Sequence, residues 1–380
     1  MGLEGNALLL GLDIGGVNIK CSSVQWKDAG HLEQAISTKT FFPLWKQSIT
    51  ELHVELARVM AVHLAKYLSR NDHEIRLTVY PCASITGELS DAFASKKEGI
   101  ERITSSLGSA LDAVREAYPA TFCTIMEPRF VAVDGTLRTM QQANARHREV
   151  AAANWHATAA WVGSFVPDCI LMDCGSTTTD IIPIMAGKPS PKGKTDLDRL
   201  RSGELVYTGA LRATIPSIAR AVPIHGELVP VSFEKFALMA DVHLLLGNIT
   251  REQYDCDTAD GRSTSIDDCK KRLARIVCED AAELGDDVIL EMARFLANAQ
   301  VKMVQDALAR VIARGHANRS IVVTGLGEAP IAMQAAEQAG CKDIISLAGK
   351  IGTAASIASS SVGILHILAT WLDEAGFDGW

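Results

Sequence analysis

Two stretches of the chain combine an aspartate with a tight turn of small residues between two apolar runs. In residues 171–182, Asp173 ends the first apolar run, and this pattern predicts a strand, a turn and a second strand. The backbone N–H groups and hydroxyls of such a turn form a concave surface that suits phosphate oxygens. Asp173 is then placed to hold Mg²⁺, directly or through water. The residues of this turn are Gly175, Ser176, Thr177 and Thr178.

The N-terminal segment repeats this design, with Asp13 at the end of an apolar run and a glycine turn after it. Lys20 follows Asp13 by seven residues and would reach the phosphates from the second strand. An ordinary hairpin is the alternative for each stretch, with glycines that only supply positive φ and a solvated lysine. The matched pair favours one phosphate site, with Asp13 and Asp173 facing each other as Mg²⁺ ligands. The other residues of this turn assigned to phosphate binding are Gly15, Gly16 and Asn18.

A third segment, residues 320–330, predicts a buried strand that enters a glycine turn before a helix. Its turn residues Thr324 and Gly325 are candidates for holding a nucleoside or another flat group. The sequence contains no G-x-x-x-x-G-K-[ST] motif and no G-x-G-x-x-G after a strand, so the common nucleotide-binding motifs are missing.

Composition narrows the class of protein. The chain has 380 residues with 48% hydrophobic content, enough for two domains with their own cores. Its net charge of -8 and the lack of a basic block argue against nucleic acid as a partner.

Nine cysteines without a C-x-x-C pair predict free thiols in a reducing cytoplasm. Serines and His366 interrupt the apolar run 357–372, which predicts a packed helix rather than a membrane span. A homo-oligomer remains open.

Strands alternate with helical patterns along the chain, which predicts the α/β class with mixed sheets. Helices are expected at 49–68, 99–118 and 144–162, and strands at 74–80 and 121–126. Residues 187–201 are expected to form a long loop, residues 238–275 an irregular region, and residues 274–314 two helices.

Together, the two hairpins and the Thr324-Gly325 turn resemble the actin-like ATPase superfamily, which includes sugar kinases, Hsp70, actin and the hydantoinase/oxoprolinase enzymes. The resemblance implies two duplicated, ribonuclease H-like domains with mixed sheets, flanking helices and a central cleft. It places the first domain at residues 1–150 and the second at 151–355, with an inserted loop and helical region at about 187–275. Residues 356–380 are expected to return to the first domain as a C-terminal helix.

A closer resemblance lies between the hairpins, in residues 42–46, 86–91, 97–99, 153–159, 193–200, 203–209 and 258–262. These segments are similar to a subfamily found with tetrahydromethanopterin-linked one-carbon pathways, whose archaeal members include the methanofuran-biosynthesis synthase. The resemblance implies a transferase that joins a (5-aminomethyl-furan-3-yl)methyl diphosphate to the phenol oxygen of γ-glutamyl-tyramine and releases diphosphate. A tyrosine derivative is the alternative acceptor.

That chemistry requires cations at the leaving group and a base near the phenol, whose pKa is about 10. The phenol base is Asp196 or Asp198, and the residues alone do not choose between them. The resemblance and the loop positions suggest further substrate-binding residues, namely Lys46, Glu88, Asp91, Lys97, Asn154, Lys194 and Arg199.

Two other functions stay open on this fold, since a fold alone does not fix an activity. One is an ATP-dependent kinase or a hydantoinase-like amidohydrolase, with Asp173 at Mg·ATP and the Thr324-Gly325 turn at adenosine. The other is a non-catalytic binding protein. ATP is not expected as a substrate, because Val17 and Asn18 stand where ATPases of this superfamily usually carry Thr or Ser.

Overall fold

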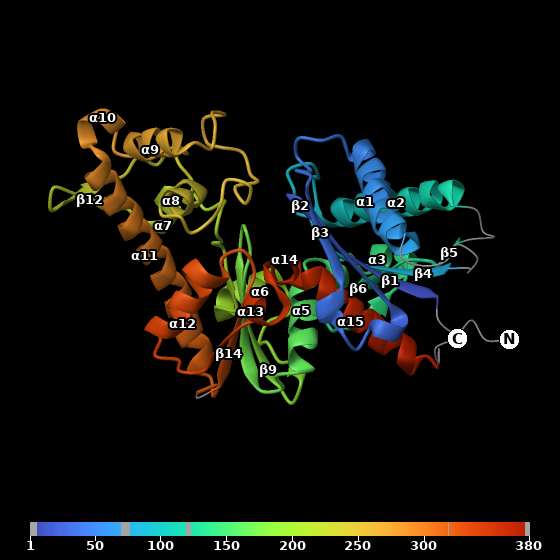
Figure 1. The fold of residues 1–380 in the computed structure, drawn as a ribbon. Helices are drawn as coiled ribbons and strands as arrows, with labels where there is room; N and C mark the ends of the chain where they lie inside the picture. Colours follow the sequence, from blue (N-terminus) through green and yellow to red (C-terminus); the bar gives the residue numbers. More distant parts are fainter. Residues whose placement is uncertain (1–5, 70–76, 119–122, 318, 377–380) are drawn as a thin grey trace.

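Two mixed β-sheets organise the part of the chain that the structure describes (Figure 1). The structure is a computed structural model that describes residues 6–69, 77–118, 123–317 and 319–376. The first sheet runs in the order β3 (Ile36–Phe41), β2 (Asn18–Gln25), β1 (Ala7–Gly15), β4 (Leu77–Thr86), β6 (Arg129–Val131) and β7 (Leu137–Arg138), and β5 (Cys123–Ile125) pairs with β4. The second runs in the order β10 (Lys188–Pro189), β9 (Thr179–Met185), β8 (Cys169–Cys174), β14 (Ser320–Thr324) and β15 (Ile344–Ser346), and β11 (Leu205–Val206) pairs with β9.

Helices flank both sheets, so the predicted α/β fold with mixed sheets is confirmed. The earlier helices are α1 (Ile49–Leu68), α2 (Lys96–Ala117), α3 (Met140–Ala145), α4 (His147–Val150), α5 (Asn154–Gly163), α6 (Asp196–Ser202), α7 (Ile215–Ile218) and α8 (Met239–Leu245). The later helices are α9 (Ile266–Arg275), α10 (Ala281–Leu284), α11 (Asp286–Ile312), α12 (Gln334–Gln338), α13 (Leu347–Ile351), α14 (Thr353–Ile357) and α15 (Ser359–Glu374). Shorter elements are η1 (Trp26–Asp28), η2 (Leu32–Gln34), the π-helical η3 (Glu328–Met333) and the hairpin of β12 (Ala221–Ile224) and β13 (Glu227–Pro230).

The two sheets share one strand arrangement. In the first, β1 is antiparallel to β2 and parallel to β4, and in the second, β8 is antiparallel to β9 and parallel to β14. The register places Asp13 opposite Lys20 and Asp173 opposite Asp180. Asp13 and Asp173 therefore occupy equivalent positions in two copies of one strand pattern.

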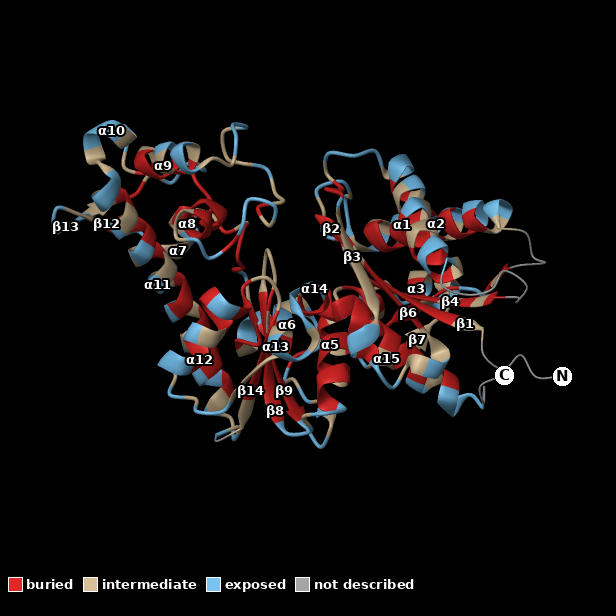
Figure 2. Ribbon diagram, viewed as in Figure 1, coloured by how far each residue is buried: buried red, intermediate tan, exposed pale blue. Residues whose placement is uncertain are grey.

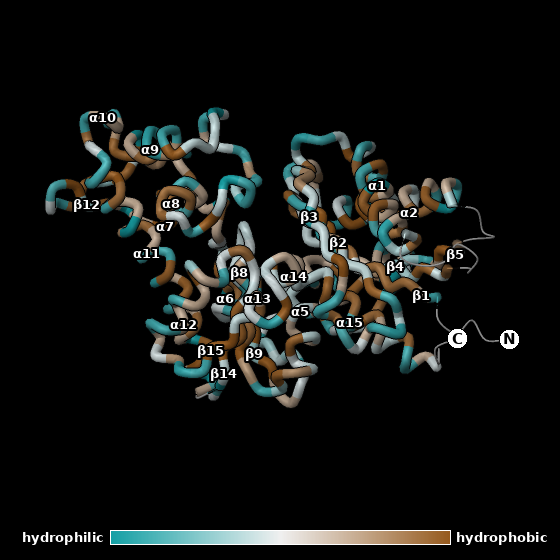
Figure 3. Tube along the Cα trace, in the orientation of Figure 1, coloured by the Kyte–Doolittle hydropathy of each residue, from teal (hydrophilic) through white to brown (hydrophobic). Residues whose placement is uncertain are grey.

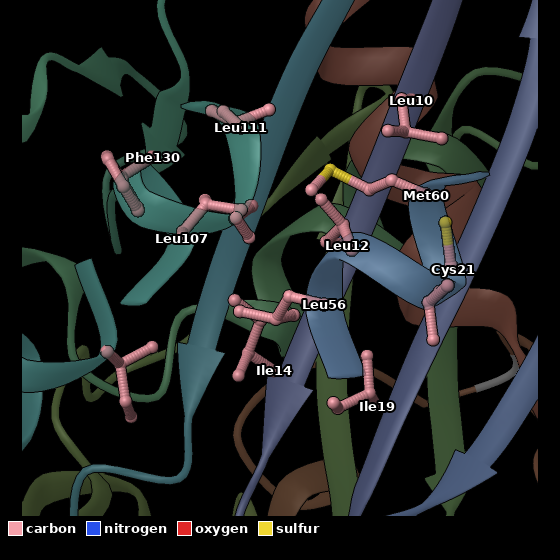
Figure 4. Close-up of a cluster of buried hydrophobic side chains, with 14 of the residues drawn as sticks. Leu10, Leu12, Ile14, Ile19, Cys21, Leu56, Met60, Leu107, Leu111 and Phe130 are labelled. Carbon is pink, nitrogen blue, oxygen red and sulfur yellow. The ribbon is translucent and has the colours of Figure 1, made fainter. Parts of the chain in front are cut away.

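Side chains alternate between the faces of each sheet, as strand geometry requires. Leu10 and Leu12 of β1 share a buried cluster with Leu56 of α1 and Leu107 of α2, on the face that these helices cover (Figure 4). Leu9, the residue before Leu10, belongs to a different cluster. The strands are accordingly buried on both faces, which Figure 2 shows as red sheets between helices that are blue on their outer sides.

A middle layer of two helices, α5 and α15, joins the sheets. Leu9 of the first sheet and Leu171 of the second share a buried cluster with Trp155 of α5 and Leu368 of α15. In Figure 1 the red α15 lies against the blue first sheet, although the two are far apart in the sequence. The end of the chain therefore completes the core that begins with β1.

The opposite face of the second sheet packs against α11, α12 and α8, and a further cluster joins α7, α8, α9 and α11. In Figure 3 the brown, hydrophobic segments gather inside these groups, and the teal segments lie mostly along loops and outer helix faces. Among the described residues, no helix has the length and apolar character needed to span a membrane.

Several predicted elements need correction. The single helix expected at 144–162 is broken between α4 and α5, where Ala152 adopts a φ of 50°. The loop expected at 187–201 contains β10 and the start of α6, which Thr195 caps. The irregular region 238–275 contains α8 and α9. The helix at 49–68 is confirmed by α1. The first residues of the strands expected at 74–80 and 121–126, and residues 377–380, lie outside the described residues.

Candidate functional site

A cavity of about 630 Å³ opens beside both aspartate hairpins and is lined by residues from both sheets. Most of the sequence-predicted site residues line this cavity. They are Asp13, Gly15, Gly16, Asn18, Lys20, Glu88, Asp91, Asn154, Asp173, Gly175, Ser176, Thr177, Thr178, Asp196 and Arg199.

Asp13 is held by hydroxyl donors on three sides and is almost fully buried. Its Oδ1 accepts hydrogen bonds from Ser84 (3.1 Å) and Thr86 (3.2 Å) of β4, and its Oδ2 accepts one from Ser360 (2.6 Å). The Lys20 ammonium lies 3.8 Å from the same Oδ2. The sequence placed Lys20 near the phosphate site, and the structure brings it to the cavity beside Asp13.

Asp173 has fewer partners than Asp13. Its Oδ2 accepts from Ser359 at 3.2 Å and, at the limit of a hydrogen bond, from Thr158 at 3.5 Å. The surrounding protein raises the pKa of the Asp173 carboxyl to about 6, because burial disfavours the charged form. Lys20 opposes this shift in pKa, whereas Asp180 and Asp13 add to it.

The start of α15 connects the two hairpins. Consecutive residues Ser359 and Ser360 each donate a hydrogen bond to one aspartate, Asp173 and Asp13 respectively. Because α15 is 16 residues long, its N-terminus also carries unpaired N–H groups and the positive end of the helix dipole. The same turn of helix therefore holds both carboxylates and places the positive end of the helix dipole beside them.

Asp180 is a third carboxylate in the cavity lining, and Arg199 balances its negative charge in an ion pair. It is buried, it lies opposite Asp173 in the register, and Arg199 donates a hydrogen bond to its Oδ1. Arg199 also donates to Asp196 at 2.9 Å, and its guanidinium stacks over the ring of Trp155 at 4.9 Å from the centroid. Burial raises the pKa of Asp180, and the charge of Arg199 counteracts it.

The turn after Asp173 is supported from behind by a polar chain. A Cβ on Gly209 would lie 2.6 Å from the Gly175 oxygen and the Thr177 nitrogen, so only glycine fits there. The Gln300 amide donates to the Thr208 hydroxyl at 2.8 Å and to the Gly209 carbonyl oxygen at 2.9 Å. These contacts support the turn on the side away from the cavity.

Another part of the cavity lining is aromatic and cationic. Arg212 stacks over the ring of Trp45 at 4.6 Å from the centroid, and Tyr207 is 67% exposed. Trp45, Tyr207, Arg212 and Lys235 all line the cavity. This combination provides flat surfaces and positive charge for a ligand that carries a ring and carboxylates.

Six predicted site residues do not line the cavity, namely Lys46, Lys97, Lys194, Asp198, Thr324 and Gly325. Lys46 forms an ion pair with Asp257, which does line it, at 2.8 Å. Lys97 lies 3.7 Å from Glu101 one turn along α2, and Lys194 is exposed. Asp198 accepts a hydrogen bond from Thr195 at the start of α6 and lies 3.6 Å from Arg201.

The Thr324-Gly325 turn packs behind Asp173 instead of facing the cavity. The Thr324 hydroxyl is fully buried and bonds with Ser356, and a Cβ on Gly325 would lie 2.3 Å from the Cys174 carbonyl oxygen. Gly325 has a φ of +95°, a second reason for glycine at this position. Tight packing of the hairpin explains this turn without a bound nucleoside.

Sequence reasoning missed Asp180, Ser359 and Ser360. Asp180 follows Asp173 by seven residues, the same spacing that drew attention to Lys20 after Asp13. Applying that spacing to the second hairpin would have found it. The serines stand at the start of a helix, where hydroxyls commonly gather, but no local pattern ties them to either aspartate.

The cavity residues fit Mg²⁺ when substrate oxygens complete its coordination. Among the described residues no group of three His, Cys, Asp or Glu side chains is arranged to hold a metal by itself. Mg²⁺ in phosphate sites is usually held by one or two carboxylates together with phosphate oxygens and water. The carboxylates of Asp13, Asp173 and Asp180 all act on the Lys20 ammonium, which lies 3.8 Å from Asp13, so a divalent ion would add positive charge where a diphosphate meets these three carboxylates.

The sequence of this chain is similar to a known family and to two known synthases. The family model for hydantoinase/oxoprolinase matches residues 80–363. A (4-{4-[2-(gamma-L-glutamylamino)ethyl]phenoxymethyl}furan-2-yl)methanamine synthase from Methanocaldococcus jannaschii is 34% identical over 371 residues, covering 97% of this chain and 99% of the relative. A synthase of the same name from Methanococcus vannielii is 32% identical over 208 residues, covering 54% of this chain and 93% of that relative.

The nucleotide-free structure of an acetone carboxylase has a TM-score of 0.50 to this one at 12% identity, covering 95% of this chain and 70% of that chain. At this identity the likeness shows the fold alone, and it confirms the expected actin-like architecture. The family model spans most of the chain, and the Methanocaldococcus jannaschii synthase matches it almost end to end. The chain therefore belongs to the hydantoinase/oxoprolinase family.

Proposed function

We propose that this chain is a synthase of methanofuran-type cofactor biosynthesis that forms an aryl ether. It joins a (5-aminomethyl-furan-3-yl)methyl diphosphate to the phenol oxygen of γ-glutamyl-tyramine, or of a γ-glutamyl-tyrosine derivative, and releases diphosphate. The observation that carries the proposal is the 34% identity to a synthase of this kind over 97% of the chain. A cavity with both phosphate-type turns and an aromatic, cationic wall supports it.

The reaction needs the diphosphate to leave with its electron pair. The furan ring stabilises positive charge on the methylene carbon, so the remaining requirement is to neutralise the leaving group. In this proposal backbone N–H groups of the Gly15-Gly16 turn and of Ser176–Thr178 bind the phosphate oxygens, and Lys20 provides a fixed positive charge. Mg²⁺ held by Asp13 and Asp173 would supply further charge neutralisation at the diphosphate.

The acceptor occupies the aromatic and cationic wall. Trp45 and Tyr207 present ring surfaces to the phenol, and Arg212 and Lys235 pair with the glutamyl carboxylate. These residues come from segments that lie far apart in the sequence, so acceptor binding involves both sheets. The partners in this proposal are small molecules, with no role for nucleic acid or a membrane.

A reducing, cytoplasmic setting belongs to the same proposal. All nine cysteines are free, and six of them are buried, where burial raises the pKa of each thiol. Buried thiols with raised pKa values are poor nucleophiles and behave as small apolar side chains. Their abundance without a disulfide fits a compartment in which thiols stay reduced.

The test is an assay of purified protein with the furan diphosphate and each acceptor, γ-glutamyl-tyramine and γ-glutamyl-tyrosine. We expect Mg²⁺-dependent release of diphosphate together with an ether product detected by mass spectrometry. Diphosphate release with no ether would indicate hydrolysis of the donor. Absence of both products, with either acceptor and with Mg²⁺ present, would contradict the proposed function.

A further inference from the structure

The Glu88 carboxylate lies in the cavity wall, and neither diphosphate release nor acceptor binding, as proposed, uses it. It follows β4 by two residues, it is 2% exposed, and it lines the cavity. Its Oε1 lies 3.7 Å from the ammonium of Lys96, but its Oε2 is buried without a hydrogen-bond partner among the described residues. A buried carboxylate oxygen without a donor is costly, so this atom is suited to receive a hydrogen bond from a ligand.

Two neighbouring carboxylates share one ammonium across the cavity. Lys96, at the start of α2, lies 3.5 Å from Asp196 of α6 as well as 3.7 Å from Glu88. Asp196 has a second cationic partner, since Arg199 donates to it at 2.9 Å. Glu88 therefore has the less compensated charge of the two.

The balance of charge and burial sets the proton affinity of Glu88. Burial raises its pKa to about 7, with a further increase from the nearby charge of Asp196, and Lys96 opposes the shift. A carboxyl group with a pKa near neutrality is an effective general base, because it is often deprotonated and still binds a proton well. The two bases considered from sequence are weaker candidates: Asp196 is paired twice, and Asp198 does not line the cavity.

We propose that Glu88 is the catalytic base that takes the phenol proton of the acceptor, and that Lys96 is a positioning residue that orients its carboxylate. The inference deepens the proposed function and rests on it. The phenol oxygen forms its bond to the furfuryl methylene carbon as the carbon–oxygen bond to diphosphate breaks. The electron pair of that bond leaves with diphosphate, the phenol proton passes to Glu88 Oε2, and solvent takes it after product release.

The first test compares Glu88→Gln with Glu101→Gln, a matched change on the exposed side of α2. For Glu88→Gln we expect kcat to fall by about 100-fold or more, the range for losing a general base. The wild-type kcat should rise with pH through about 7 as Glu88 loses its proton, and this rise should vanish in Glu88→Gln. Glu101→Gln should keep both the rate and the pH profile of the wild type.

Two further measurements separate proton transfer from a structural effect. A ring-fluorinated acceptor has a more acidic phenol, so it should recover a large part of the rate in Glu88→Gln but change the wild type little. In Lys96→Met the rise of kcat should move to higher pH, because Lys96 lowers the pKa of Glu88. A merely structural role would give neither rescue nor a shifted profile.

The possible outcomes separate the assignment of Glu88 as the base from the proposed ether-forming function. A wild type that makes no ether refutes the proposed function and the assignment of Glu88 together. An active wild type with a Glu88→Gln variant that keeps its rate and its pH profile refutes the assignment of Glu88 alone. Loss of activity without rescue by the fluorinated acceptor, and without a shift in Lys96→Met, also refutes it.

Discussion

Asp173 shows how burial and a neighbouring charge set the properties of one carboxylate. We expect Asp173→Asn to leave the fold intact and to lower kcat by about 100-fold or more, since it removes one electrostatic contributor to the transition state. Raising the Mg²⁺ concentration should recover part of the activity if the defect lies in metal binding. The measurement is steady-state release of diphosphate, together with a melting curve. A normal melting curve with near-normal release would show that this hairpin is structural.

The pKa of Asp173 also predicts how Mg²⁺ and pH act on stability. The folded-state pKa of about 6 lies above the ordinary value of 3.8, so without metal this group favours folding at low pH. That contribution is lost as pH rises through about 6, because the carboxylate becomes charged while buried. Mg²⁺ binds the charged form, so it should raise the melting temperature more at pH 8 than at pH 5.

The size of this effect follows from binding linkage. At a Mg²⁺ concentration about 100-fold above Kd, the stabilisation at pH 8 should be about 2 to 3 kcal/mol. Thermal melts with Mg²⁺ and with EDTA at the two pH values check it. Asp173→Asn is the control, in which the difference between the two pH values should shrink. An equal effect of Mg²⁺ at pH 5 and pH 8 would argue against Asp173 as a ligand.

The sequence does not show which of two adjacent lysines, Lys96 or Lys97, reaches the carboxylates of the cavity. Lys97 was predicted as a site residue, yet its neighbour Lys96 reaches Glu88 and Asp196 while Lys97 lies near Glu101. One residue turns the side chain by about 100° around the helix axis. Both lysines precede the helix expected at 99–118, whereas α2 already begins at Lys96, and the packing of that helix decides which lysine approaches the cavity.

The first turn of α15 donates hydrogen bonds to both aspartates, and its role can be tested directly. We expect Ser360→Ala, which removes the 2.6 Å hydrogen bond to Asp13, to lower kcat by about 10-fold or more, as is typical when a ligand loses its supporting hydrogen bond. Ser359→Ala should act on Asp173 in the same direction. Ser361→Ala is the control, because its hydroxyl contacts Ser22 and not an aspartate. Equal activity in all three variants would remove α15 from the catalytic arrangement.

The turn after β8 depends on the glycine behind it. In Gly209→Ala the new methyl group would overlap the Gly175 and Thr177 backbone, so the turn must shift. We expect a loss of stability of about 1 to 3 kcal/mol and a higher KM for the diphosphate substrate. Gly30→Ala is the control, since a Cβ there meets no atom within 4 Å. Urea unfolding and substrate titration measure both effects, and an unchanged KM would mean that the turn does not bind the diphosphate.

Patterns that depend on neighbouring residues were predictable from the sequence, and those that depend on distant contacts were not. Both aspartate hairpins follow from apolar runs and small turn residues, which act locally. The contacts of Ser359 and Ser360 span 186 and 347 residues, so only the folded chain reveals them. The break between α4 and α5 was also hidden, because alanine-rich sequence favours a continuous helix and tertiary packing overrides that preference.

At the scale of the whole molecule, the fold it shares with ATP-dependent enzymes does not imply ATP use. We expect calorimetry with Mg·ATP to show no tight binding and no turnover. Val17, which lines the cavity, stands where ATPases of this superfamily usually present a hydroxyl, and the Thr324-Gly325 turn is occupied by packing contacts. Tight binding of Mg·ATP with hydrolysis would instead favour a kinase-like activity.

Ion pairs between distant segments tie the two sides of the molecule together. Lys39 of β3 lies 2.5 Å from Asp255, Lys46 lies 2.8 Å from Asp257, and Lys96 reaches Asp196. Each pair joins the neighbourhood of the first sheet to a segment that follows the second hairpin. The cavity is therefore defined by contacts between both sides, and its catalytic groups come from each of them.

The position of α15 has a consequence for how the protein is made. During translation the first sheet leaves the ribosome early, but the apolar side of β1 that carries Leu9 receives its covering helix only when residues 359–374 have been synthesised. Until then the nascent chain exposes an apolar sheet surface, and such surfaces are prone to aggregate. Completion of the N-terminal core thus waits for the synthesis of residues 359–374, and until then the apolar surface around Leu9 is open to a chaperone that shields apolar side chains.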